Sequence, residues 1–131
     1  MAVGSTAREL PFQAVHYLRK TVNHTMDGGP AQTVGVIPAG SLILKPLSGV
    51  QVTTVFDAGT TNTLNVGTSA DDNLYGTLLA LGALAFVPLD EAVSTLVAAD
   101  TTITATVVLT GTASTAGEGE VVIAYIPDND G

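Results

Sequence analysis

Two histidines are the first side chains in this sequence that could do chemistry. His16 and His24 lie eight residues apart. If both lie on one continuous strand, a rise of about 3.3 Å per residue separates them too widely to share a metal ion. A turn between them would remove that objection. We therefore expect surface or half-buried histidines, and we keep open only a metal site assembled from several copies around a symmetry axis.

The run Asp71-Asp72-Asn73 is the second candidate, because it places three oxygen-bearing side chains in one loop. Such side chains can converge on a hard cation such as calcium, with Asp57 or Asp100 as further ligands. The run lacks the alternating oxygen spacing of an EF-hand loop. An Asx turn, in which side-chain oxygens accept from nearby backbone amides, explains it more simply. We predict no metal site and no cofactor.

The sequence lacks the common catalytic patterns. Ser41 follows a glycine but precedes Leu42, so the nucleophile motif Gly-x-Ser-x-Gly is missing. Adjacent acids such as Asp71-Asp72 cannot by themselves flank a glycosidic bond. The run from Gly117 to Gly119 begins like a dinucleotide-binding fingerprint, but Val122 stands in place of the third glycine and a strand pattern follows. We predict that the protein is not an enzyme.

Length and composition favour one β-rich domain. The chain has 131 residues, 12% of them charged, and no cysteine. The missing cysteines exclude a disulfide framework and a thiolate metal site. The abundance of threonine, valine and glycine is typical of β-structure with many turns.

Charge is distributed unevenly along the chain. All four basic residues, Arg8, Arg19, Lys20 and Lys45, lie in the first 45 positions, whose net charge is +2, whereas the remaining positions carry −10. Proteins that bind nucleic acid need basic residues to neutralise phosphates, so we expect no nucleic-acid partner. The acidic part is either a solvated shell or a surface for a basic partner.

Short strand-like segments follow one another along most of the chain, divided by turns rich in glycine and proline. We expect strands at 12–22, 33–37, 41–47, 50–57, 63–67, 85–89, 101–110 and 121–126, and a further short one at 94–97. Leucines at 74, 78 and 81 favour a helical turn or irregular structure over 74–84. About eight short strands predict an all-β fold, an antiparallel β-sandwich that is jelly-roll-like.

The segment from Thr101 to Ile126 has the strongest pattern and reads as a hairpin. Its first arm alternates apolar residues with threonines, as a half-buried strand does. Its second arm is apolar on both faces, which predicts a central strand or one that meets a neighbouring subunit. We assign a subunit interface to one face of this arm: Val121, Ile123 and Tyr125.

The beginning of the chain does not resemble a signal peptide, and the longest apolar run, 78–89, is about half a membrane span. We expect no export and no membrane partner. We divide the chain into an N-terminal arm, residues 1–10, and a single β-sandwich domain, residues 11–131.

Several phrases resemble small virion proteins of tailed bacteriophages. These are Ile37 to Ile43 (IPAGSLI), Thr63 to Tyr75 (TLNVGTSADDNLY) and Thr115 to Tyr125 (TAGEGEVVIAY). Similar phrases recur in jelly-roll-like capsid decoration, cement and head-fibre proteins, and the resemblance covers roughly residues 34–126.

The resemblance implies a structural protein that decorates or cements the capsid exterior. Such a protein would be assembled in the host cytoplasm, form a homotrimer on the capsid surface and bind the major capsid protein. The uneven charge then suggests that Arg8, Arg19, Lys20 and Lys45 face the capsid. The alternative is a carbohydrate- or host-surface-binding jelly roll of a tail or head fibre, with Tyr17 or Tyr75 exposed in a groove.

Overall fold

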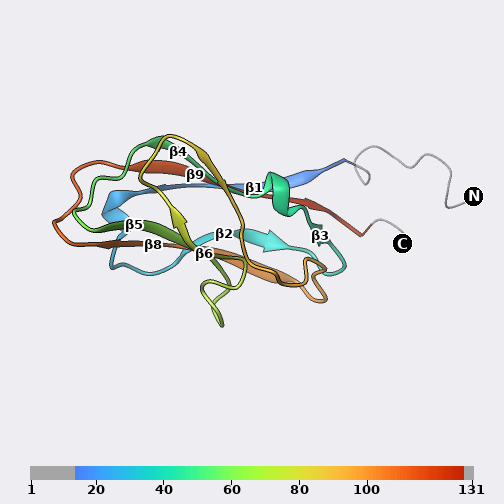
Figure 1. The fold of residues 1–131 in the computed structure, drawn as a ribbon. Helices are drawn as coiled ribbons and strands as arrows, with labels where there is room; N and C mark the ends of the chain where they lie inside the picture. The colour runs from blue at the N-terminus through green and yellow to red at the C-terminus, as the bar shows by residue number, and fades with distance from the viewer. Residues whose placement is uncertain (1–13, 129–131) are drawn as a thin grey trace, which may run out of the picture.

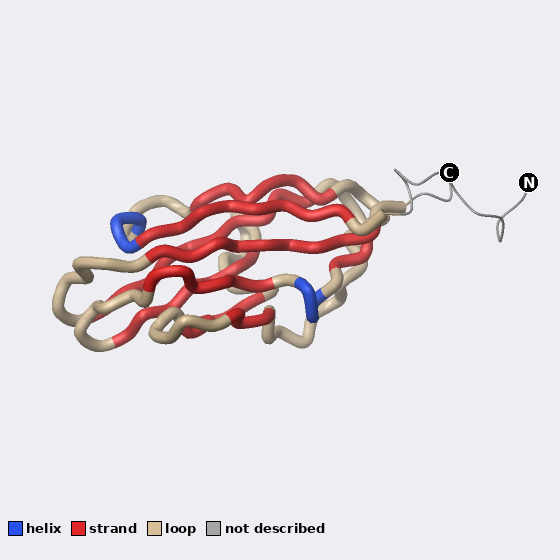
Figure 2. Tube along the Cα trace, turned by 90° about the horizontal axis from the view of Figure 1, so that it is seen from above, coloured by secondary structure: helices blue, strands red, loops and turns tan. Residues whose placement is uncertain are grey.

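Two antiparallel sheets pack face to face in the computed structural model, which describes residues 14–128 (Figure 1). The expected arm, residues 1–10, lies outside the described residues. Two short 3-10 turns, η1 (His24–Met26) and η2 (Lys45–Leu47), interrupt the strands. Figure 2 shows the strands running side by side along the molecule, with loops gathered at its ends. The strands described are β1 (His16–Asn23), β2 (Gln32–Ile37), β3 (Leu42–Ile43), β4 (Gly49–Thr54), β5 (Thr61–Gly67), β6 (Gly76–Ala80), β7 (Phe86–Pro88), β8 (Thr101–Thr110) and β9 (Glu118–Ile126).

The strand order is that of a jelly roll. Sheet A has the order β1-β9-β4-β7, with β3 also paired to β9, and sheet B has the order β2-β8-β5-β6. The antiparallel pairs are nested along the chain, since β1 pairs with β9, β2 with β8, β4 with β7 and β5 with β6. Rolling such a nested set produces two four-stranded sheets, to which β3 is a short addition. The predicted all-β, jelly-roll-like sandwich is confirmed.

The core lies between the sheets and takes alternate side chains from both. Each fully buried valine, leucine or isoleucine contributes about 1.5 to 3 kcal/mol relative to its exposed state. Phe56, which is 2% exposed, lies beyond the end of β4 in the same core. The innermost aliphatic residues are Val22, Val50, Val52, Val121 and Ile123 from sheet A, and Ile37, Leu64, Val66, Ile103 and Val107 from sheet B.

The hairpin predicted from Thr101 to Ile126 is wrong, although both of its strands exist. Strand β8 lies in sheet B between β2 and β5, and β9 lies in sheet A between β1 and β4. Residues 111–117 therefore cross from one sheet to the other. Both strands gain hydrogen-bonded partners on two edges in this way, which mutual pairing in an isolated hairpin would not give them.

The crossing passes close over the core and requires glycine at its last residue. Gly117 has a φ of +148°, and a Cβ built there would lie 2.5 Å from Cδ2 of Phe56. Any larger residue would clash with the buried ring and adopt an unfavourable backbone conformation.

The segment 74–84 contains a strand where we expected a helical or irregular segment. Strand β6 pairs with β5, and the register shifts between Leu64 and Val66. Leu78 has a φ of +50°, and its N–H donates to Oδ1 of Asn65 at 2.8 Å. This irregular step breaks the two-residue alternation of the strand, which is why the leucine spacing looked helical.

The predicted strand at 41–47 is interrupted at Pro46, which lies in η2 between β3 and β4. Proline cannot donate to a ladder, so the backbone turns away from β9 there. Ser48, which is fully buried, supplies a side-chain hydrogen bond where the backbone ladder to β9 is interrupted. Its Oγ accepts from Ala124 N at 2.9 Å and donates to Leu44 O at 2.8 Å. A side chain thus continues the bonding between β3 and β4.

The replacement Ser48→Ala should destabilise the fold by about 1 to 3 kcal/mol, because it leaves the buried Ala124 N–H without its acceptor. Urea unfolding measures this change. The exposed loop serine gives the control, since Ser69→Ala should stay within about 0.5 kcal/mol of the wild type. Equal stability of Ser48→Ala and the wild type would contradict this structural role.

Candidate interaction surface

The two outer faces of the sandwich differ in chemistry. Residues paired directly across a ladder share one face of the sheet, so the strand registers assign each side chain to a face. The outer face of sheet B is dominated by hydroxyls, several of which bond within the sheet, as Thr63 does to Val108 O at 2.9 Å. These threonines are Thr33, Thr61, Thr63, Thr102, Thr104, Thr106 and Thr110.

The outer face of sheet A is apolar at the end where β3 lies, and polar toward the start of β9, where Thr21, Gln51 and Glu120 share a row. Leu96 bridges to Leu42, and Leu42 pairs with Ile126, so three aliphatic side chains form a row across the sheet. Val15, just before β1, extends this row by alternation. Leu96 is 61% exposed and Val15 is 46% exposed. Large aliphatic groups gathered on one surface are unusual for a surface that faces only water.

Further rows continue this surface along the strands. Tyr17, 61% exposed, pairs with Ala124. Val122 lies in a row that ends with Pro88, and Phe86 ends the next row. We call this surface the apolar face and define it by Val15, Tyr17, Leu42, Phe86, Pro88, Leu96, Val122, Ala124 and Ile126.

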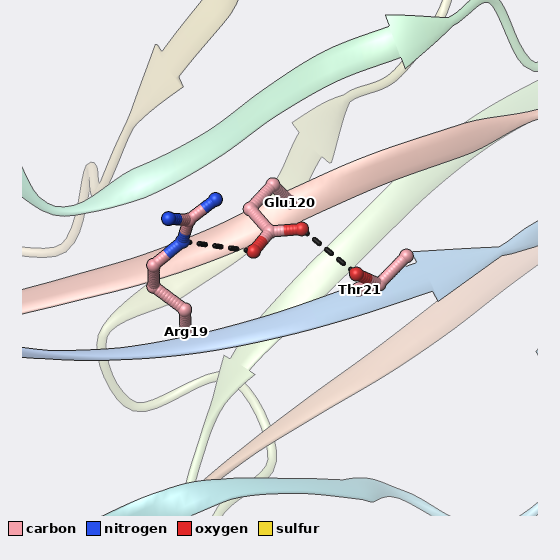
Figure 3. A network of polar contacts seen from close by, with 3 residues as sticks. All are labelled: Arg19, Thr21 and Glu120. Atoms are coloured by element: carbon pink, nitrogen blue, oxygen red, sulfur yellow. Dashed lines mark hydrogen bonds and ion pairs between the residues drawn. The ribbon is translucent and has the colours of Figure 1, made fainter.

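An ion pair lies where the apolar face meets the polar end of sheet A, in the rows of Val122 and Phe86. Figure 3 shows this pair. Arg19 Nε donates to Oε1 of Glu120 at 2.9 Å, and Thr21 Oγ1 donates to Oε2 at 2.8 Å. Both carboxylate oxygens are therefore bonded, and the two charges cancel. A pair this exposed to solvent contributes about 0.2 to 1 kcal/mol.

The basic residues predicted to face a capsid do not share one surface. Arg8 lies outside the described residues. Arg19 and Lys20 are consecutive on β1, so their side chains leave opposite faces. Lys45 lies in η2, and its Nζ donates to the backbone oxygen of Glu91. Arg19 and Lys45 are thus bonded within the chain.

The residues assigned to a subunit interface, Val121, Ile123 and Tyr125, face the core. They are 0%, 1% and 8% exposed, because they pack between the sheets of the same chain. The opposite face of β9 carries Val122 and Ile126 and belongs to the apolar face. The surface of β9 that a partner can reach is therefore this second face.

The histidines and acids of the metal hypotheses lie apart. His16 packs against Tyr125, with ring centroids 5.7 Å apart, and His24 begins η1. Asp71 Oδ1 accepts from Asn73 N at 3.3 Å, as an Asx turn does. Among residues 14–128, no three histidine or acidic side chains are grouped to hold a metal. No helix in that range is long and apolar enough to span a membrane.

Several aspartates join loops to one another. Asp27 Oδ1 accepts from Leu109 N at 2.8 Å, Asp90 Oδ1 from Thr77 N at 2.9 Å and Asp100 Oδ1 from Ala39 N at 2.9 Å. Asp57 is the most heavily bonded, since it accepts from the 114–116 segment of the crossing loop. Much of the acidic charge therefore has a role in the fold itself.

The comparisons with known proteins give a fold neighbour. No family model matches the sequence, and no curated protein does. Among solved structures, a chain of "Cyanophage Pam1 capsid asymmetric unit" is similar, with a TM-score of 0.63 and 23% identity. The match covers 93% of this chain and 91% of that chain. At this identity, the likeness shows that the two chains share a fold over nearly their whole lengths.

Sequence reasoning did not find the apolar face. Leu42 and Leu96 are 54 positions apart, and only the ladder shows that they share a row. The sequence contains one indication of this surface, because the residues of β9 are apolar on both faces of the strand. The interface was predicted on the other of these two faces.

Hydrogen bonds from the Thr115 and Ser114 side chains, and from the Ala116 and Thr115 amides, hold the pKa of the Asp57 carboxyl well below its usual range. A carboxyl whose pKa is lowered by folding stabilises the protein above its unfolded pKa of about 4, and this contribution is lost as the pH falls toward the folded pKa. We expect Asp57→Asn to lower the Tm near pH 7, and the difference from the wild type to shrink as the pH falls below 4. Thermal unfolding at several pH values measures both effects.

The matched control for this prediction is Asp72→Asn, which removes the same charge from an exposed position of the β5–β6 loop. Its Tm near neutrality should follow the wild type. A difference between Asp57→Asn and the wild type that stayed constant from pH 7 to pH 2 would contradict the role of the Asp57 charge.

Proposed function

We propose that this chain is a structural protein of a bacteriophage virion, which binds the major capsid protein on the capsid surface as a trimer and stabilises the shell. The observation that carries the proposal is the shared fold, nearly end to end, with a chain of the cyanophage Pam1 capsid asymmetric unit. Assembly of the chain in the host cytoplasm before it binds the capsid is part of the proposal.

The contrast between the two outer faces supports a role in assembly. The exposed threonines on sheet B, such as Thr33 and Thr102, can be hydrated, whereas the apolar face on sheet A gains free energy when a partner covers it. Aspartates that join the loops, such as Asp57 and Asp100, keep the ends of the sandwich in defined positions. A rigid sandwich with one hydrated and one apolar face suits a protein that assembles on a shell.

A role without catalysis is part of the same proposal. The acids that a hydrolase would need to place across a cleft instead bond to backbone amides, as Asp57, Asp90 and Asp100 do. The histidines are likewise engaged, since His16 packs on Tyr125 and His24 Nδ1 lies 3.4 Å from Gly117 O.

A capsid contact through basic residues remains a proposal for Arg8, Arg19, Lys20 and Lys45. Arg19 and Lys45 would have to exchange their bonds within the chain for bonds to the capsid, which reduces what each can contribute. Lys20 lies on the edge strand β1, where a partner can approach from the side.

A carbohydrate-binding fibre module is less well supported than this virion role. Stacking on a sugar needs an accessible aromatic ring. Tyr75 is only 7% exposed, and burial raises the pKa of its hydroxyl. Tyr17 is exposed, but Ala124 and Ile126 beside it offer no hydrogen-bonding side chains, and Arg19 on the same face of β1 is already bonded to Glu120.

Mass spectrometry of purified virions tests the virion role. The protein should be present in a fixed ratio to the major capsid protein and should bind purified capsids that lack it. Native mass spectrometry of the free protein should give three chains per particle. Absence from purified virions would overturn the proposal.

Charge reversal tests the basic contact separately. Replacing Arg8, Arg19, Lys20 and Lys45 by glutamate should weaken capsid binding at low salt, because it places four negative charges where the contact needs positive ones. Binding is measured by co-sedimentation with capsids. The comparison variant carries Thr33→Glu and Thr102→Glu on the outer face of sheet B. Undiminished binding by the first variant would exclude the basic contact.

A further inference from the structure

We propose that the apolar face of sheet A is the surface on which copies of this chain pack against one another. The inference rests on the oligomer in the proposed function and specifies which surface builds it. The capsid contact is a separate part of that function.

The apolar face is continuous, and its area is comparable with that of a small protein interface. Strands β1, β9, β4, β7 and β3 have 8, 9, 6, 3 and 2 residues. At about 4.8 Å between strands and 3.3 Å of rise per residue, they span roughly 440 Å² in projection. Two copies would together bury roughly 900 Å² of projected area, which is close to the lower limit of about 1,000 Å² for a specific protein interface. The row from Leu96 through Leu42 to Ile126 lies on this surface, and none of these side chains is buried by the chain itself.

The charge of the protein favours some partners over others for the apolar face. The chain has a net charge of −8, so two copies repel one another where their acidic loops meet. On the outer face of β1 and β9, Arg19 and Glu120 bond to each other, and Glu118 at the start of β9 adds one further negative charge. A like-charged copy is therefore repelled less at this face than at the acidic loops.

A basic partner would be expected elsewhere. Most of the other described acids lie in loops and would attract a positively charged surface there. These are Asp27, Asp57, Asp71, Asp72, Asp90, Glu91 and Asp100. Charge therefore favours a second copy as the occupant of the apolar face.

The residue types exposed on β1 are also typical of protein interfaces. Tyrosine and arginine are enriched among the residues that contribute most to protein interfaces. Tyr17 is exposed at the edge of the face, two positions from Arg19 on the same side of β1. The guanidinium, bonded to Glu120 through Nε alone, keeps other donors for a carbonyl or carboxylate of the neighbouring copy.

Charge placed on the face tests the proposal. The double variant Tyr17→Glu, Leu96→Glu changes two exposed side chains on the apolar face, whereas Thr33→Glu, Thr102→Glu adds the same charge to the outer face of sheet B. Light scattering after gel filtration should show the wild type and the sheet B variant as oligomers, and the apolar-face variant as a monomer with an unchanged circular dichroism spectrum. A monomeric wild type would overturn the proposal, and so would an oligomeric apolar-face variant.

Cysteine labelling identifies what covers the face, because the chain has no cysteine of its own. In Leu96→Cys, maleimide labelling should slow as the protein concentration rises and the chains assemble. In Thr102→Cys, it should be equally fast at every concentration. Labelling of Leu96→Cys that is fast at all concentrations would contradict packing through this face.

Two outcomes would assign the face to other occupants and overturn the inference. Slow labelling of Leu96→Cys at every dilution, made fast by deletion of residues 1–13, would show that the chain's own first residues cover the face. Labelling of Leu96→Cys that slows only when purified capsids are added would show that the capsid covers the apolar face. Labelling that slows only with capsids would contradict the packing of copies through this face but not the virion role. Absence of the protein from purified virions would contradict the virion role and would not change the labelling results.

Discussion

Strand β9 is hydrogen-bonded along both of its edges, and sheet A depends on it. It pairs with β1 over the full length of that strand, and on its other edge with β3 and then β4. Where η2 separates β3 from β4, the Ser48 hydroxyl accepts the N–H of Ala124. Because both edges are occupied, β9 can meet further partners only through its two faces. One faces the core, and the other is part of the apolar face.

The crossing before β9 places it in sheet A. Residues 111–117 pass over Phe56 at Gly117, and Asp57 fixes the loop through bonds to Ser114, Thr115 and Ala116. Strand β8 can then take β2 and β5 as neighbours in the other sheet. The apolar stripes of β8 and β9 meet across the core, while the threonines of β8 and the second apolar stripe of β9 face outward on opposite sides of the molecule.

This separation gives the sandwich two unlike surfaces. The exposed hydroxyls of sheet B, such as those of Thr33 and Thr102, are compatible with water, whereas Tyr17, Leu42 and Leu96 present apolar area that water solvates poorly. The acids lie mainly in loops, and several of them accept hydrogen bonds from backbone N–H groups. These side chains therefore give the protein its negative charge and also hold the loops in place. A negative particle with one side that is largely apolar, and on which Arg19 neutralises Glu120, is a physical basis for ordered association, because like charges discourage contacts through the loops.

The sequence by itself determined the all-β class, most strand positions and the turns, because strand alternation and the backbone limits of glycine and proline are local properties. It also indicated that β9 is apolar on both faces. It did not determine that Thr101 to Ile126 cross between sheets, that Leu78 forms an irregular step in a strand, or that Val121, Ile123 and Tyr125 take the core side. Only the tertiary structure decided these, because strand partners and the choice between two apolar stripes depend on residues far away in the chain. For the same reason, Leu42, Leu96 and Ile126 form one surface only once the ladders that join them exist.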